Sequence, residues 1–135
     1  RALVLSNLVA IHQKTGIGRL SAYCGAVSAG AAAGAGIAYL CGGGYEEVIH
    51  TVVNALAIVS GMVCDGAKAS CAAKIASSVD AGILGYNMYL RGQQFYAGDG
   101  IVTKGVEATI QNIGRLGKDG MKETNEEIIK MMISD

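Results

Sequence analysis

The stretch that decides the fold is Leu20–Cys41, LSAYCGAVSAGAAAGAGIAYLC, which carries no charged residue and is followed by three glycines at 42–44. This stretch is long enough to span a membrane. Its apolar residues, however, are mainly Ala and Gly, which contribute much less transfer free energy than Leu or Ile. A helix that is apolar all round is typical of a buried helix in a helical bundle. We therefore predict a buried central helix and no membrane partner.

The rest of the chain predicts further helices around this central one. The chain has no proline and 20 glycines, and its apolar residues recur mostly at helical spacing. We expect helices over residues 2–14, 19–41, 45–62, 70–91 and 106–116, a surface loop over 92–105, and a last helix that opens with a capping box at Thr124. The predicted fold is all-α, a single compact bundle of about six helices around a long buried Gly/Ala-rich helix. Residues 1–135 have the length of one domain.

Two side-chain patterns predict how these helices pack. In the helix over 70–91, the large apolar residues are expected to face inward: Ile75, Val79, Ile83 and Leu84. In the central helix, glycines allow neighbouring backbones to approach closely. We interpret Gly25, Gly30 and Gly34 as such close-packing positions.

The composition argues against several classes of protein. The 11 basic and 11 acidic residues give a formal charge of zero, so the basic surplus of a nucleic-acid-binding protein is missing. Nothing after Arg1 resembles a signal peptide. Four cysteines in a chain without a secretory signal indicate a reducing compartment, in which disulfides are rare. We expect a cytoplasmic protein with no nucleic-acid partner.

Cys24, Cys64 and Cys71 form the candidate site. If the helices over 19–41 and 45–62 form an antiparallel hairpin, each leg is about 30 Å long at 1.5 Å per residue. The start of the first leg then lies beside the end of the second, which brings Cys24 and Cys64 to the same end. Cys71 begins the next helix from there. Cys41 lies about 25 Å from Cys24 along its helix and is excluded from the site.

Three thiolates from separate segments can hold a metal ion or an iron–sulfur cluster and leave one coordination position open. Zinc is the weaker option because the chain has no Cys-x-x-Cys pair. His12 and His50 lie on other helical segments and are interpreted as partly buried structural histidines. An oxidisable Cys64–Cys71 dithiol is a third option. The plainest alternative is that the cysteines are small buried apolar residues.

Asp65 and Lys68 are the candidate substrate-binding residues. They lie in the loop before a helix whose N-terminal amides carry partial positive charge, which stabilises thiolates. Lys68 is a candidate for binding a substrate carboxylate, and Asp65 for orienting the loop amides. A solvated surface lysine and a turn residue are the alternative interpretations.

Three motifs carry a family resemblance. Residues 60–74, SGMVCDGAKASCAAK, resemble the C-terminal signature of the L-cysteine desulfidase-like family within the serine dehydratase alpha-chain superfamily. Residues 107–116, EATIQNIGRL, and 120–124, GMKET, resemble the C-terminal segment of the same family. The spacing of Cys24, Cys64 and Cys71 is also similar to that of the cluster cysteines of iron–sulfur L-serine dehydratases.

The resemblance implies a [4Fe–4S] cluster held by the three cysteines, with one labile iron that acts as a Lewis acid. It implies β-elimination of an amino acid, giving pyruvate, ammonia and, from L-cysteine, sulfide. Gly66 stands where the dehydratase signature has proline, and the loop to Cys71 is shorter, which favours the desulfidase-like branch. L-serine dehydratase and a non-enzymatic helical interaction domain are the alternatives.

The family members are much longer, so this chain resembles their C-terminal, cluster-binding domain. The resemblance implies that the N-terminal part of the same protein supplies the base that removes the α-proton. We expect no turnover of L-cysteine or L-serine by residues 1–135 alone. A homo-oligomer is compatible with these features.

Overall fold

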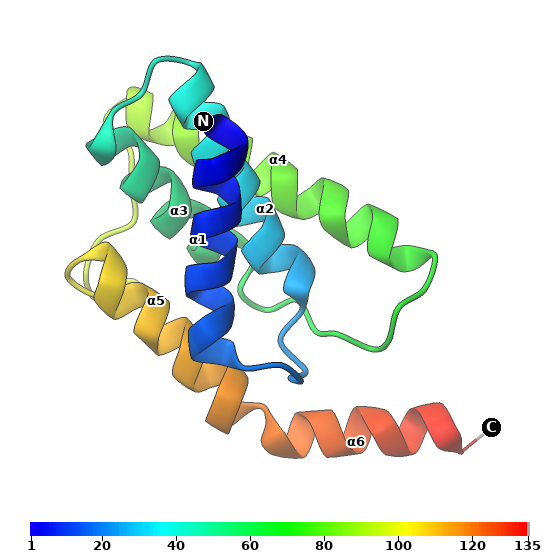
Figure 1. The fold of residues 1–135 in the computed structure, drawn as a ribbon. Coiled ribbons are helices and arrows are strands. Elements are labelled where there is room, and N and C mark those ends of the chain that lie inside the picture. Colours follow the sequence, from blue (N-terminus) through cyan, green and yellow to red (C-terminus); the bar gives the residue numbers. More distant parts are fainter. Residues whose placement is uncertain (135) are drawn as a thin grey trace.

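The computed structural model describes residues 1–134, which form helices joined by loops (Figure 1). Six α-helices and one short π-helix make up the fold: α1 (Ala2–Ile17), α2 (Gly25–Leu40), α3 (Tyr45–Val59), α4 (Ser70–Leu90), α5 (Val106–Arg115), η1 (Leu116–Gly120) and α6 (Lys122–Ile133). Over 1–134 the extended structure is limited to one isolated bridge, between Tyr23 and Val63. The all-α prediction is confirmed.

The Gly/Ala-rich helix α2 lies at the centre, as predicted. It packs against α1, α3 and α4, and most of its residues are buried. In Figure 1, α2 runs behind α1 and between α3 and α4. None of the helices in the described part of the chain has the length and apolar character needed to cross a membrane.

Glycines set the distance between α2 and α4. A Cβ atom added at Gly30 would lie 2.3 Å from the Cβ of Ser78, and one added at Gly34 would lie 2.7 Å from the Cα of Gly82. No side chain fits between two backbones at these distances. The close-packing prediction is therefore confirmed for Gly30 and Gly34. It is wrong for Gly25, since a Cβ there would meet no atom within 4 Å.

The predicted inward face of α4 is wrong for the large residues. Ile75, Ile83 and Leu84 are 49%, 40% and 51% exposed. The buried residues of this helix are mostly small: Ser78, Ala81, Gly82, Gly85 and Tyr86. Because α2 approaches α4 at glycine distance, only small side chains fit in most of the interface, and the larger apolar residues turn outward.

Several predicted helix boundaries also differ from the structure, and the helix predicted over 45–62 ends at Val59. The central helix begins at Gly25, not at residue 19, because the preceding segment is held in extended form by the Tyr23–Val63 bridge. The first helix continues through Gly16 and ends at Ile17, and it is followed by Gly18, whose φ is 95°. The last helix begins at Lys122, with Met121 between it and η1, so Thr124 lies inside its first turn and is not the N-cap.

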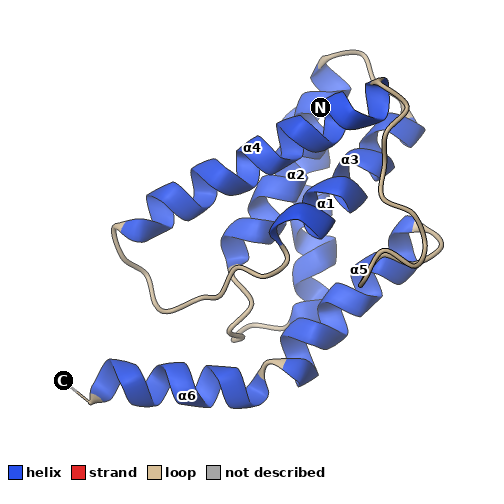
Figure 2. Cartoon of the chain, turned by 180° about the vertical axis from the view of Figure 1, so that it is seen from behind, coloured by secondary structure: helices blue, strands red, loops and turns tan. Residues whose placement is uncertain are grey.

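The C-terminal helix α6 extends away from the bundle. It has no buried residue and, among the described helices, packs only against η1. Figures 1 and 2 both show it on the same side of the molecule as the loop between α3 and α4. One contact joins the two, since a Cβ added at Gly66 in that loop would lie 2.9 Å from the Cε of Met132.

Candidate metal centre

Backbone pairing brings Cys24 and Cys64 together. The amide of Cys24 donates to the carbonyl of Met62 at 3.1 Å, and the amide of Cys64 donates to the carbonyl of Ala22 at 2.6 Å. These bonds flank the antiparallel Tyr23–Val63 bridge. Alternate residues of an extended segment point to opposite faces, so Cys24 and Cys64 project to the same side of this pair. The α2–α3 hairpin thus places them at one end, as its predicted geometry required.

Cys24 occupies a special backbone position. It is the N-cap residue of α2, with extended backbone angles of φ −67° and ψ 124°. Its side chain is buried and belongs to the hydrophobic core. The N-terminus of a helix carries partial positive charge, which favours an anionic thiolate at this position. Cys41 lies at the other end of the same helix and is exposed, so its exclusion agrees with the structure.

Cys71 is held within the loop that precedes it. It lies in the first turn of α4, where its thiol donates to the carbonyl of Gly66 at 3.5 Å. The backbone amide of Lys68 donates to its sulfur, also at 3.5 Å. Cys71 is therefore a partly buried thiol at the positive end of a second helix.

Lys74 is the residue that sequence reasoning missed. Its Nζ donates to the carbonyl of Val63 at 2.9 Å and to Oδ1 of Asp65 at 2.5 Å. The hydrogen bond that Lys74 donates to Asp65 raises the pKa of Lys74 against the opposing effect of desolvation, and the nearby Cys24 and Cys71 add smaller increases. Its ammonium group is therefore within electrostatic range of two of the three thiols. Its spacing of three residues from Cys71 on one helix was the available signal.

Asp65 and Lys68, the two candidate substrate-binding residues, are paired with each other. Asp65 also bonds Lys74, so its carboxylate lies between two ammonium groups. The hydrogen bond from Lys68 and then that from Lys74 lower the pKa of Asp65 to about 2. The carboxylate is therefore ionised and already engaged, while Lys68 is about half exposed. Their role toward a substrate stays a prediction.

The three thiols fit an iron–sulfur cluster by their chemistry. They come from three segments, two of them lie at helix N-termini, and Lys74 is within electrostatic range of two of them. Within residues 1–134, no three His, Cys, Asp or Glu side chains lie close enough together to hold a single metal ion. The structure therefore brings Cys24 and Cys64 to one side of the paired segments and leaves Cys71 outside a common ligand group. The ligand roles of Cys24, Cys64 and Cys71 stay a prediction.

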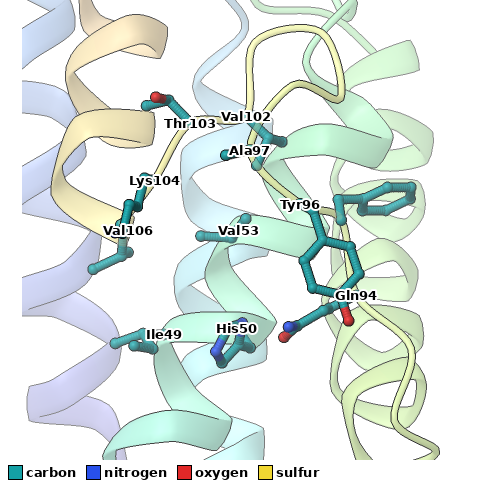
Figure 3. Close-up of a pocket in the computed structure, with 12 residues that line it drawn as sticks. Ile49, His50, Val53, Gln94, Tyr96, Ala97, Val102, Thr103, Lys104 and Val106 are labelled. Atoms are coloured by element: carbon teal, nitrogen blue, oxygen red, sulfur yellow. The ribbon is translucent and has the colours of Figure 1, made fainter.

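The two histidines lie on other surfaces. His12 is exposed, contrary to the prediction of partial burial, and its Nε2 lies 2.9 Å from Glu107. His50 is partly buried and stacks on Tyr89 with ring centroids 4.5 Å apart. His50 also lines a cavity of about 300 Å³ between α3 and the loop after α4. In Figure 3, Gln94 points its amide toward His50, and the cavity contains none of the candidate cysteines.

Comparison with known proteins extends over almost the whole chain. The family model described as serine dehydratase alpha chain matches residues 1–130. A UPF0597 protein of Desulfitobacterium hafniense is 70% identical over 134 residues, which are 99% of this chain and 31% of that protein. UPF0597 proteins of Lachnoclostridium phytofermentans and Treponema denticola are 59% and 55% identical, over 99% and 100% of this chain. The chain thus spans about a third of the length of these relatives. No solved structure gives a significant match.

Proposed function

Because this chain belongs to the serine dehydratase alpha chain family, we propose that it is the cluster-holding domain of an amino-acid β-eliminating lyase. The observation that carries the proposal is the antiparallel pairing of residues 22–24 with 62–64, which sets Cys24 and Cys64 on one side of the pair. Cys71 lies in the first turn of the next helix, α4. The proposed cofactor is a [4Fe–4S] cluster with these three cysteines as ligands.

When bound, a cluster with three cysteine ligands would supply Lewis-acid chemistry, which stabilises negative charge on a leaving group. The residues of this chain hold and orient that group. Cys24 is fixed by the N-cap of α2, Cys64 by its bond to Ala22, and Cys71 by the first turn of α4. Lys74 and the two helix N-termini balance the thiolate charge.

The proposed reaction is conversion of L-cysteine and water to pyruvate, ammonia and sulfide. Removal of the α-proton and loss of sulfide give an enamine, which water hydrolyses. Gly66 after Cys64-Asp65 favours this reaction over the corresponding elimination of water from L-serine. The described residues offer no evident base beside the thiols, because Asp65 is bound by two lysines. We propose that the base and the rest of the substrate pocket come from the remainder of a longer cytoplasmic polypeptide, as long as the relatives.

The full-length polypeptide tests this function after anaerobic reconstitution with iron and sulfide. We expect pyruvate and sulfide from L-cysteine, less pyruvate from L-serine, and no turnover by residues 1–135 alone. Cys64→Ser should abolish turnover, whereas Cys41→Ser should retain it. Absence of pyruvate from both amino acids in the reconstituted wild type would overturn the lyase function and favour a helical interaction domain.

A further inference from the structure

Lys74 connects two segments that carry different cysteines. It lies on α4 one turn after Cys71, and its Nζ reaches across to the carbonyl of Val63, the residue before Cys64. Further along α4, the hydroxyl of Ser78 donates to Sδ of Met62 at 3.9 Å, a weaker bond that does not reach the backbone of Val63 or Cys64. One side chain therefore ties the extended segment that ends at Cys64 to the helix that begins near Cys71.

The side chain of Lys74 is mostly shielded from solvent. It is 20% exposed, and Asp65 holds the ammonium group from the loop side at 2.5 Å. Cys24 and Cys71 also lie within electrostatic range of it. An ammonium group in this position compensates negative charge that three thiolates bring together, and such outer contacts keep metal-holding side chains in place.

Lys68 provides a contrast within the same loop. It bonds the same carboxylate, Asp65, only three residues away, and its side chain is 49% exposed. Its ammonium group has no bond to a backbone carbonyl of the Cys64 segment, which Lys74 has. Removing Lys68 therefore takes away a local surface ion pair, which contributes little.

We infer that Lys74 is the positioning residue of the cysteine site, and that it holds the Cys64 segment against α4 so that the cysteines face one cluster. The inference rests on the proposed function for the identity of the cluster. The tie between Val63 and α4 is independent of any metal.

The first experiment measures iron release from the reconstituted full-length polypeptide. A chelator is added anaerobically, and loss of the cluster absorption is followed in the wild type, Lys74→Met, Lys74→Arg and Lys68→Met. Loss of a contact outside the ligand shell costs about 10- to 100-fold in metal affinity. We expect Lys74→Met to release iron at least about tenfold faster than the wild type. Lys68→Met should stay within about twofold. Lys74→Arg should restore part of the retention, because it keeps the charge and the donors.

The second experiment uses the metal-free polypeptide and follows hydrogen exchange of the amides at residues 62–66. Lys74→Met should speed exchange of the Cys64 amide, whereas Lys68→Met should leave it unchanged. If the wild type takes up no iron but this difference is found, the proposed cluster is wrong and the tie stands. Equal exchange in Lys74→Met and the wild type would overturn the inference, whether or not iron binds.

Discussion

Helix α4 meets its neighbours in two different ways along its length. Toward its C-terminal half, Gly82 and Gly85 lie against α2 and α3 with no side chain of their own between the helices. At its N-terminal end, Cys71 and Lys74 reach the neighbouring loop through polar bonds. Packing in the first region requires glycines, which have no side chain, whereas contacts in the second region require particular polar and charged side chains.

The difference separates the fold from the candidate site. A close glycine contact leaves no room for an added methyl group, and its contribution to stability does not depend on charge or pH. The cysteine end contains a partly exposed ion triad, formed by Asp65 with Lys68 and Lys74. These residues can be substituted without creating a cavity or a steric overlap in the core. Mutations in the glycine region should therefore change the free energy of unfolding, whereas those at the cysteine end should change cluster retention.

The largest effect on stability is expected from Gly30→Ala. The new Cβ would lie 2.3 Å from the Cβ of Ser78 and 2.5 Å from its carbonyl oxygen, so α2 and α4 would have to separate. We expect a loss of about 3 kcal/mol or more in the free energy of unfolding, measured by urea denaturation. Gly25→Ala is the matched control, because the same methyl group meets no atom within 4 Å there. Equal stability of the two variants would contradict the close-packed interface.

A smaller change in the free energy of unfolding, of opposite sign, is expected from Tyr23→Phe. Tyr23 lies where the two regions meet. Tyr23 is buried beside Cys24, and within the described residues its hydroxyl has no hydrogen-bond partner. Removing an unsatisfied buried hydroxyl should stabilise the protein by about 1 kcal/mol. Tyr45→Phe, at an exposed position, should leave the urea midpoint unchanged. A clear loss of stability in Tyr23→Phe would mean that the hydroxyl has a partner in the protein.

Because of Tyr23, we also expect the free energy of unfolding to depend on pH in the alkaline range. Burial and the neighbouring Cys24 thiolate raise the pKa of Tyr23 above its ordinary value of 10.0. The unfolded chain therefore releases this proton first as pH rises, so stability is retained below pH 10 and falls above it. Urea titrations of the wild type and Tyr23→Phe above pH 10 check this, and the variant should lose less stability.

The smallest effect on the free energy of unfolding is expected when acid protonates Asp65 at the cysteine end. The pKa of Asp65 is lowered from 3.8 to about 2, so its contribution is present above pH 3.8 and is lost as pH falls toward 2. The difference in stability between the wild type and Asp65→Asn should shrink over this interval. Since the carboxylate is partly exposed, added salt should reduce the same difference. A difference that is constant from pH 4 to pH 2 would show that the triad does not form.

The sequence predicted the architecture because the architecture depends on long patterns. An uncharged Ala/Gly stretch and a glycine turn are enough to predict α2 and its hairpin with α3, and the hairpin brings Cys24 and Cys64 together. The same reasoning excluded Cys41, which lies at the opposite end of α2. The position of a cysteine along a hairpin depends only on helix length and on the place of the turn.

The parts that were not predicted depend on distances between elements. Helical periodicity selects large apolar residues as the buried face, so it selected Ile75, Ile83 and Leu84 and missed Ser78 and Gly82. The extended pairing around Tyr23 is too short to leave an alternating pattern. Lys74 could be placed on the same helix as Cys71, but its bond to Val63 depends on the path of the loop.

The most direct test of the central claim is the iron and acid-labile sulfide content of the full-length polypeptide after anaerobic reconstitution. The three cysteines are predicted to hold one cluster, so the wild type and Cys41→Ser should each contain about four irons and about four sulfides per chain. The triple variant Cys24→Ser, Cys64→Ser, Cys71→Ser should contain none and should lack the cluster absorption. Full iron and sulfide content in that triple variant would contradict the assignment of these cysteines as ligands.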